Sequence, residues 1–399
     1  MQYDFTTCYD RHGYDALCVE TLGNGFAPDA PKDGFDPIPM WIADMNFATA
    51  PSVQRALTER IAHPIYGYFE TRQEYYDAII RWHRDSFGVE NLTADCIGYE
   101  NGVLGGVASA IRALCAPGDP ILIHAPTYVG FTFTLADAGY RLVHSQLVKD
   151  EQDVWRMDFA DMERKIVEHG IRAAVLCSPH NPTGRVWERW ELEQAMALFE
   201  KYDIKVVCDE IWADLTMDDH RHIPVQTISE DAKHRTVATY APSKTFNLAG
   251  LIGSYHVIYD PYLRDRVRRQ SQLTHYNSMN VLSQHALLGA YCEEGRQWLN
   301  QLRQVLSNNL DYACQYIQTH FEGVKTQKPQ GSYLMFADCT DWCAAHGKTI
   351  EQLLKACWDV GVACQSGKKF QTPCHLRLNL ALPLHRVQEA FDRLDKYVF

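Results

Sequence analysis

The chain has 399 residues, 46% of them hydrophobic, so it can bury a large core, and its length suggests two domains. Its formal net charge is −12 and it has no run rich in Lys or Arg, which argues against binding to nucleic acids or to anionic membranes. The first residues, MQYDFTTCYDRHGYD, contain no apolar signal-peptide core, and no apolar stretch approaches the roughly 20 residues that span a bilayer. The sequence therefore predicts a cytoplasmic protein.

Residues 1–45 are rich in Gly, Pro and Asp, which predicts an arm with little regular structure that packs on a smaller domain or on a partner. Between residues 100 and 260, short apolar β-branched runs alternate with longer amphipathic stretches. The predicted strands are 120–126, 171–179, 203–210, 235–243 and 251–259. The predicted helices are 103–115, 159–170 and 188–202. This alternation is typical of an α/β fold with a mostly parallel sheet covered by helices.

The strand signal thins after about residue 282, where a long helical region begins. GSYLMFADC (331–339) and HLRLNLALP (375–383) are the later strand candidates, so this part of the chain predicts a smaller α+β domain. The sequence predicts an arm and two domains, with the following bounds. Residues 1–48 form the N-terminal arm and part of the small domain, 49–284 the large domain, and 285–399 the small C-terminal domain.

The 13 cysteines are scattered and include no CxxC pair. Cys339 and Cys343, with His346 nearby, have a spacing that could form part of a metal site. Many of the others lie within apolar runs, where reduced thiols pack as small hydrophobic groups. The sequence therefore favours free thiols and predicts no metal.

Two glycine-containing loops stand at predicted strand ends. ENGVLGG (100–106) opens a helix, and its glycines allow backbone N–H groups to approach an anion, although taken alone the pattern is explained better by ordinary loop glycines. SPHNPTG (178–184) follows a buried strand, and its prolines fix a rigid loop around Asn181. A plain turn is the alternative, but ligands of open α/β sheets bind at this edge.

Two charged side chains follow the next predicted strands. Asp209 ends the apolar run VVCD, where a lone carboxylate is costly without a partner, although it could also cap a helix that has Glu210 in its first turn. Lys244, in YAPSKTFNLAGL (240–251), has apolar and hydroxyl neighbours that would desolvate its amine and make it nucleophilic. A lysine that reaches solvent at a domain edge is the alternative. An anion site, an amide, a carboxylate and a desolvated amine in this order suit pyridoxal phosphate.

These motifs resemble those of fold-type I pyridoxal-phosphate enzymes of the aminotransferase class I/II superfamily, and within it the MalY/PatB branch of cystathionine β-lyases (C–S lyases). The resemblance extends over nearly the whole chain. The matching segments are PMWIADMNFATAP (39–51), IYGYFE (65–70), APTYVGF (125–131), SPHNPTGRVW (178–187), DEIWADLT (209–216), APSKTFNLAGL (241–251), GSYLMF (331–336) and LRLNLALP (376–383). The segments around Asn181, Asp209 and Lys244 carry the superfamily assignment, and MWIADMNF and SKTFNLAG carry the branch.

The resemblance implies pyridoxal 5′-phosphate as the cofactor and a small amino acid as the substrate. Lys244 would hold the cofactor covalently and act as the catalytic base. Asp209 would face the pyridine nitrogen and keep it protonated, and Asn181 would donate to the phenolic oxygen of the ring. The peptide bonds before Pro179 and Pro182 are expected to be cis.

The resemblance also implies the residues around the phosphate. The backbone of Gly102, Val103 and Leu104 and the hydroxyl of Ser243 would bind it. Tyr66 would reach the phosphate of the neighbouring subunit, so the active unit is expected to be a homodimer.

The substrate would lie among side chains from distant parts of the sequence. Tyr128 would stack on the cofactor and contact the substrate together with Ala43. Arg377, the single arginine of an apolar strand, would form a bidentate pair with the substrate's α-carboxylate.

The sequence departs from the family pattern at three positions. Ala241 stands where a phosphate-binding Ser or Thr is usual, three residues before the lysine. Trp212 stands three residues after the aspartate, where His or Tyr is common; it would still border the cofactor, but indole cannot act as acid or base. Asn46 replaces the Asp of the family's MWVADMDF.

The reaction expected from the branch is β-elimination, which cleaves L-cystathionine or a related cysteine S-conjugate to a thiol, pyruvate and ammonia. The same residues also serve transamination, so an aminotransferase is the alternative. A regulatory protein that acts by docking is a second alternative.

Overall fold

The computed structural model describes residues 2–399, so residue 1 of the predicted arm lies outside the described residues. Its centre is an eight-stranded sheet with the strand order β2-β9-β8-β7-β6-β3-β4-β5. The strands are β2 (Ile97–Asn101), β3 (Pro120–Ala125), β4 (Arg141–Lys149), β5 (Trp155–Met157), β6 (Ala173–Cys177), β7 (Lys205–Asp209), β8 (Thr236–Tyr240) and β9 (Gly253–Val257). Strands β4, β3, β6, β7 and β8 are parallel, and β5, β9 and β2 join by antiparallel pairs. The expected mostly parallel sheet is confirmed.

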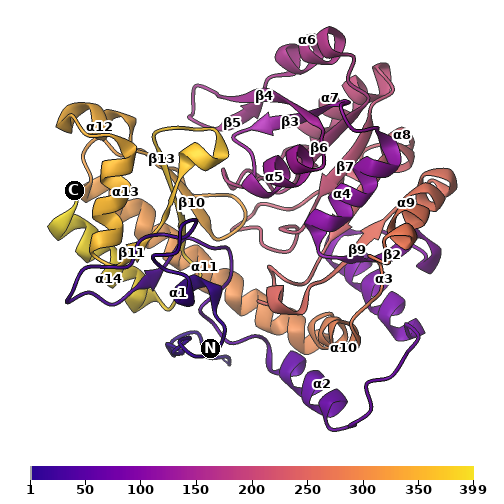
Figure 1. Ribbon diagram of the computed structural model, residues 1–399, viewed down its shortest axis with the longest axis horizontal. Coiled ribbons are helices and arrows are strands. Elements are labelled where there is room, and N and C mark those ends of the chain that lie inside the picture. The colour runs from indigo at the N-terminus through magenta and orange to yellow at the C-terminus, as the bar shows by residue number, and fades with distance from the viewer. Residues whose placement is uncertain (1) are drawn as a thin grey trace.

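Helices cover both faces of this sheet (Figure 1). Helices α4 (Val103–Leu114), α5 (Val129–Asp137) and α9 (Pro261–Leu273) share one core with the sheet. Helices α6 (Phe159–His169), α7 (Arg189–Lys201) and α8 (Glu230–Arg235) share the core of the other face. Strands β6 and β8 are buried at every residue, which explains why they lack the alternation of half-exposed strands.

The predicted helices agree with α4, α6 and α7 to within a residue or two. The predicted strands are too long at their carboxyl ends, because residues 178–179, 210 and 241–243 leave the ladder to form loops at the sheet edge. Strands β2, β4 and β5 were not predicted. Strand β4 is partly exposed near the end of the sheet, so its sequence, RLVHSQLVK, lacks an apolar run.

The C-terminal part of the chain forms a smaller α+β unit. Its three-stranded sheet has the order β10-β13-β12, with β10 (Leu334–Asp338), β12 (Gln365–Ser366) and β13 (His375–Asn379). Around this sheet lie α12 (Thr340–His346), α13 (Ile350–Asp359) and α14 (Leu384–Tyr397). The 28-residue helix α11 (Glu293–His320) runs between this unit and the larger one (Figure 1).

The N-terminal arm packs against the C-terminal unit. Its strand β1 (Ile38–Pro39) pairs in parallel with β11 (Val362–Ala363), and Asp36 accepts a hydrogen bond from Arg386 at 2.7 Å. The remaining helices are α1 (Leu17–Glu20), α2 (Pro51–Ile61), α3 (Gln73–Phe87) and α10 (Val281–Ala290). The domain boundaries at residues 48 and 284 stay a prediction.

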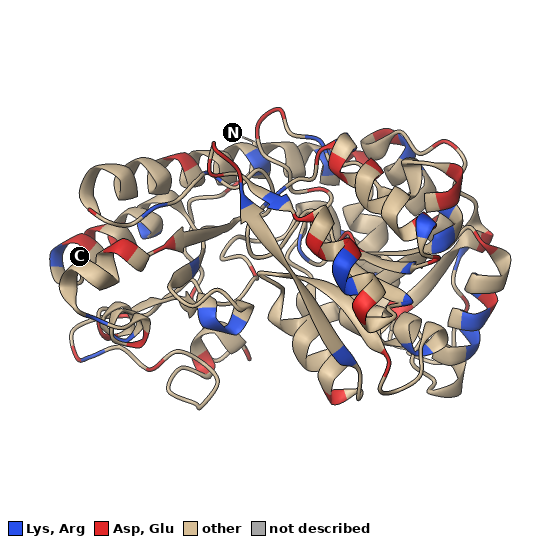
Figure 2. Ribbon diagram, turned by 90° about the horizontal axis from the view of Figure 1, so that it is seen from above, with Lys and Arg blue, Asp and Glu red and all other residues tan. Residues whose placement is uncertain are grey.

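The outer surface carries interspersed charges. Acidic and basic residues alternate over the helices in Figure 2. None of the helices in residues 2–399 is both long and apolar enough to cross a membrane. Cys339 and Cys343, whose spacing was the weaker metal-site alternative, are buried free thiols, and His346 is hydrogen-bonded through Nδ1 to the carbonyl of Trp342 at 2.9 Å.

Candidate active site

A cavity of about 260 Å³ lies at the carboxyl ends of β6, β7 and β8. Strand β2 runs in the same direction as β8, because each is antiparallel to β9, so the start of α4 opens at the same edge. The predicted residues that line the cavity are Ala43, Gly102, Val103, Leu104, Tyr128, Asn181, Asp209, Trp212, Ser243 and Lys244. The fold therefore brings together residues from most of the large unit and from the arm.

Lys244 follows β8 and extends into this cavity. Its Nζ donates a hydrogen bond to the carbonyl of Ala43 at 2.7 Å and lies 5.9 Å from the ring centroid of Trp212. Loss of hydration lowers the pKa of Lys244 to about 8, although the negative charge of Asp44 opposes this shift. Roughly a tenth of the amine is therefore unprotonated, and nucleophilic, at pH 7.

Asp209 is the last residue of β7 and is 3% exposed. One carboxylate oxygen accepts a hydrogen bond from the N–H of Ile211 at 3.0 Å. Burial raises the pKa of Asp209 to about 7, against the opposing effects of the Ile211 N–H and of Lys244. Lys244 and Asp209 thus both move toward their neutral forms despite their mutual attraction, because desolvation outweighs the attraction. A cationic group bound beside Asp209 would restore its charge.

The start of α4 presents backbone N–H donors to the same cavity. Gly102 has φ +86°, a conformation that favours glycine, and this turn leads from β2 directly into the helix. The first hydrogen bond of helical spacing runs from the N–H of Gly106 to the carbonyl of Gly102, so the N–H groups of Val103 and Leu104 have no helical partner. With the Ser243 hydroxyl, these donors suit a phosphate.

The ring of Tyr128 borders the cavity at the start of α5. It packs edge-on against Phe131, with the ring centroids 5.3 Å apart. Gly130 allows this position, because a Cβ there would lie 2.5 Å from the Tyr128 ring. Gly130 stands in APTYVGF, but its role is not visible in the sequence, since only the folded position of the ring reveals the close approach.

Arg377 lies on β13, beside the cavity, and is 3% exposed. Its guanidinium donates to Asn181 Oδ1 at 3.3 Å, to the carbonyl of Trp41 at 2.8 Å and to Gln365 Oε1 at 2.5 Å. All these partners are neutral, and its buried Nε has no partner among residues 2–399. Burial lowers the pKa of Arg377 to about 10. This charged group is therefore available to a carboxylate.

Residues 41–47, from the arm, form one wall of the site. Asn379 donates to the carbonyls of Ile42 and Asp44, at 2.7 and 2.5 Å. Asn247 donates to the carbonyls of Met45 and Phe47, at 2.9 and 3.2 Å. These contacts fix the carbonyl of Ala43 that Lys244 binds. Neither asparagine was predicted as a site residue, although they stand in the motifs SKTFNLAG and LRLN.

Asn181 lies in the loop between β6 and α7. The peptide bonds before Pro179 and Pro182 are cis, as expected, and so is the bond before Pro126. The indole N–H of Trp187 donates to the carbonyl of Cys177 at 2.8 Å, which ties the end of this loop back to β6.

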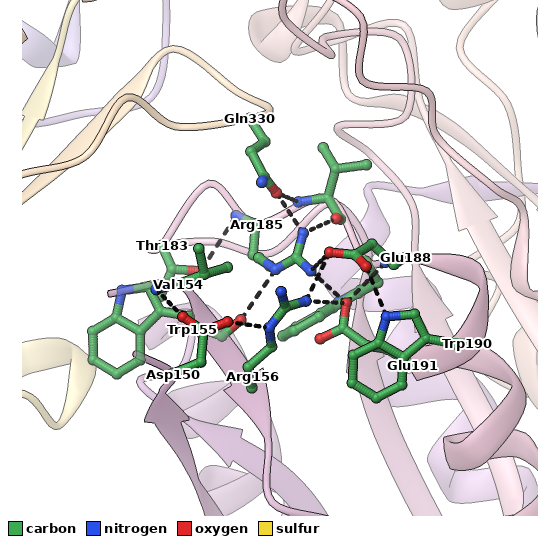
Figure 3. Close-up of polar contacts among 12 residues, drawn as sticks. Asp150, Val154, Trp155, Arg156, Thr183, Arg185, Glu188, Trp190, Glu191 and Gln330 are labelled. Carbon is green, nitrogen blue, oxygen red and sulfur yellow. Dashed lines mark hydrogen bonds and ion pairs between the residues drawn. The ribbon is translucent and has the colours of Figure 1, made fainter. Parts of the chain in front are cut away.

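The same loop is held by Arg185 (Figure 3). The Arg185 side chain is 3% exposed and donates to Glu188 at 2.8 Å and to the fully buried Glu191 at 2.5 Å. It also donates to Gln330 Oε1 at 2.5 Å, and Gln330 lies in the segment before β10 of the smaller unit. Arg185 therefore joins the Asn181 loop to both units.

Replacing Arg185 with glutamine is expected to lower the free energy of unfolding by about 3 kcal/mol, because Glu191 would stay buried with only Arg156, at 3.3 Å, as a cationic partner. Urea unfolding of the cofactor-free protein measures this change. Arg164→Gln is the control, since Arg164 is 60% exposed and its ion pairs are expected to contribute less than about 1 kcal/mol. Equal losses in the two variants would contradict the prediction.

The positions of Tyr66 and Ala241 relative to the cavity complete the set of residues named from the sequence. Tyr66 lies outside the 260 Å³ cavity, is 56% exposed, and donates to the carbonyl of Ile61 at 3.1 Å. Its expected role toward a neighbouring subunit stays a prediction. Ala241 lines the cavity, so the missing hydroxyl falls inside the site.

The chain is similar to known proteins over most of its length. The family pattern of "Aminotransferase class I and II" matches residues 39–394. "Cystathionine beta-lyase PatB" of Bacillus subtilis (strain 168) is 30% identical over 361 residues, which cover 90% of this chain and 92% of that protein.

Two solved structures share the fold. Cystalysin from Treponema denticola, which contains a pyridoxal 5′-phosphate cofactor, has a TM-score of 0.91 and 27% identity, with 99% of this chain and 98% of that chain covered. The PLP-bound C–S lyase from Staphylococcus hominis has a TM-score of 0.89 and 25% identity, with 100% and 98% covered. The expected fold type is confirmed.

Proposed function

We propose that this chain, which belongs to the aminotransferase class I and II family, is a pyridoxal-phosphate-dependent C–S β-lyase. Its substrate would be L-cystathionine or a related cysteine S-conjugate, and its products a thiol, pyruvate and ammonia. The observation that carries the proposal is the meeting of Lys244, Asp209 and the start of α4 in one cavity. The similarity to a cystathionine β-lyase and to a C–S lyase supports the choice of reaction.

The residues that line the cavity offer the groups that pyridoxal phosphate requires: donors for the phosphate, a carboxylate and an amine. The N–H groups of Val103 and Leu104 and the hydroxyl of Ser243 would hold the phosphate. Asp209 is the one carboxylate among the lining residues that the structure describes, and it would pair with the cationic ring nitrogen. Lys244 offers an amine, part of it unprotonated, for the aldehyde.

The remaining side chains would orient the cofactor. Asn181 would donate through its amide to the phenolic oxygen, from a loop that Arg185 holds in place. Tyr128 and Trp212 would cover the ring, and the packing of Trp212 against Tyr333, with ring centroids 4.9 Å apart, keeps that indole fixed. When bound, pyridoxal phosphate supplies an electron sink that stabilises negative charge on the α-carbon of an amino acid.

Lys244 would move the protons of the reaction. With a pKa of about 8, its amine can take the α-proton of the substrate and return a proton to the departing sulfur. The carbonyl of Ala43, 2.7 Å from Nζ, accepts a hydrogen bond from the amine and fixes its direction. The positive charge of Arg377, buried nearby, helps to lower the pKa of Lys244 and would also bind the substrate's α-carboxylate.

Replacing Arg377 with lysine is expected to lower kcat/KM by about 100-fold, because an ammonium group keeps the charge but loses the bidentate fork. Steady-state kinetics with L-cystathionine measure the loss. Arg172→Lys, at an exposed position, is the matched control and is expected to leave kcat/KM unchanged. A value for Arg377→Lys equal to that of the control would show that the carboxylate binds elsewhere.

The choice between elimination and transamination is tested with one substrate. Purified protein loaded with pyridoxal phosphate is incubated with L-cystathionine, and pyruvate and free thiol are measured with and without an added 2-oxo acid. A lyase releases both products without the acceptor. Turnover only in the presence of the acceptor would show that the protein is an aminotransferase and not a lyase.

The assembly and location are further parts of the proposal. We propose a homodimer, in which Tyr66 reaches the cofactor phosphate of the neighbouring subunit. The exposure of Tyr66 and of its neighbour Tyr68 supports this arrangement, because exposed aromatic side chains are typical of interfaces. A cytoplasmic location is the expectation from the sequence.

A further inference from the structure

A separate cavity of about 360 Å³ lies between the end of α3, residues 213–222 and the first half of α11. Arg221, Arg296 and Arg303 line it, together with the polar side chains of Asn300 and Gln304. No part of the proposed lyase reaction uses these residues.

The three arginines are held largely by neutral groups. Arg303 Nε donates to the carbonyl of Asp214 at 2.7 Å. Arg221 donates to the carbonyls of Asp218 and His220, at 3.1 and 2.9 Å. Among residues 2–399, neither Arg221 nor Arg303 has a carboxylate oxygen within ion-pair distance.

The third arginine is only weakly paired. Arg296 donates to the hydroxyl of Ser86 at 3.0 Å, and the nearest carboxylate oxygen, on Asp85, lies 3.8 Å away. Burial lowers the pKa of Arg303, and the nearby positive charges of Arg221 and Arg296 lower it further, against the effect of Asp214. All three guanidinium groups line the same cavity, so their positive charges repel one another.

Asp85 and Asp218 also line the cavity, and both are paired with cations of the chain. Asp85 pairs with Arg84 at 2.9 Å, and Asp218 pairs with Lys328 at 2.9 Å and accepts a hydrogen bond from Ser307 at 2.7 Å. Three arginines therefore line the cavity against two carboxylates that already have cationic partners, within a chain whose net charge is −12.

We propose that this cavity binds a small phosphate-bearing anion. Guanidinium groups bind phosphate oxygens through paired N–H donors, and an anion between them would relieve their repulsion. The amides of Asn300 and Gln304 are further donors at the same place. The cavity is larger than a bare phosphate ion, so it has room for a small organic phosphate ester as well. Inorganic phosphate and such an ester present the same phosphate oxygens to the arginines.

The site is connected to the catalytic lysine by hydrogen bonds. Arg303 donates a hydrogen bond to the backbone carbonyl of Asp214. The Asp214 carboxylate accepts a hydrogen bond from the hydroxyl of Thr245, the residue after Lys244. A bound anion would thus be linked to the residue next to Lys244 through Arg303 and Asp214.

The test uses the chain loaded with pyridoxal phosphate and reduced with borohydride, so that the phosphate site at α4 is occupied. Isothermal titration at constant ionic strength measures the binding of inorganic phosphate and, separately, of ribose 5-phosphate. We expect saturable binding of at least one of them, with one site per chain, and the tighter of the two identifies the source of the phosphate group.

Arg221→Gln and Arg303→Gln are each expected to weaken this binding by about tenfold or more. Arg189→Gln removes an exposed arginine of α7 and is the matched control, expected to bind like the parent. Arg221 is exposed, so its variant keeps the test valid if Arg303→Gln does not fold. Absence of saturable binding of both probes, or equal binding by Arg221→Gln and the control, would overturn the proposal.

Discussion

Replacing Lys244 with alanine is expected to lower lyase turnover by on the order of 10⁴-fold or more, because the variant loses both the amine that holds the cofactor and the base that takes the α-proton. Pyruvate release from L-cystathionine measures the loss. The fold is expected to persist, since the one hydrogen bond that Lys244 Nζ makes with residues 2–399 goes to the carbonyl of Ala43.

The control for this variant is Lys205→Ala. Lys205 begins β7, its side chain is 40% exposed, and its nearest carboxylate partner is Asp203 at 3.2 Å. Its variant is expected to keep the turnover of the parent. A Lys244→Ala protein that retains more than about a hundredth of parental turnover would show that another group is the catalytic base.

Replacing Asp209 with asparagine is expected to lower kcat by about 1,000-fold, because a neutral amide cannot keep the ring nitrogen protonated. Steady-state kinetics at saturating substrate and cofactor measure the loss. Asp203→Asn, at a side chain that is 81% exposed, is the matched control. Equal kcat values for the two variants would show that Asp209 has no part in the reaction.

In the cofactor-free protein, replacing Asp209 with asparagine is expected to change the pH dependence of stability. Burial raises the pKa of Asp209 from 3.8 to about 7, so the contribution of this group to stability is full below pH 3.8 and is lost as the pH rises through 7. Asparagine does not ionise. The melting temperature of Asp209→Asn minus that of the parent is therefore expected to be higher at pH 8 than at pH 5, and a lower value at pH 8 would contradict the raised pKa.

Much of the fold follows from local sequence patterns. Strands β6 and β8 are buried on both faces, so their apolar runs were visible without a structure. Asn181, Asp209 and Lys244 follow consecutive strands of a parallel sheet, which places them at one edge. Their meeting in one cavity could therefore be expected from the order of the motifs.

The parts that could not be predicted depend on distant backbone groups. Asn247 and Asn379 act on carbonyls of residues 41–47, and no sequence spacing indicates which carbonyls a side chain will reach. Gly130 matters only because the Tyr128 ring folds over it. The three arginines of the second cavity come from two distant segments, residues 213–222 and α11, so their sequence positions gave no signal.

The central claim is that the Lys244 amine forms the covalent link to pyridoxal phosphate. The most direct measurement is borohydride reduction of the protein incubated with this cofactor, followed by digestion and mass spectrometry of the peptides. The account predicts one reduced cofactor per chain, attached to Lys244. A reduced cofactor on a different lysine, or no attachment in protein whose folding is verified, would contradict it.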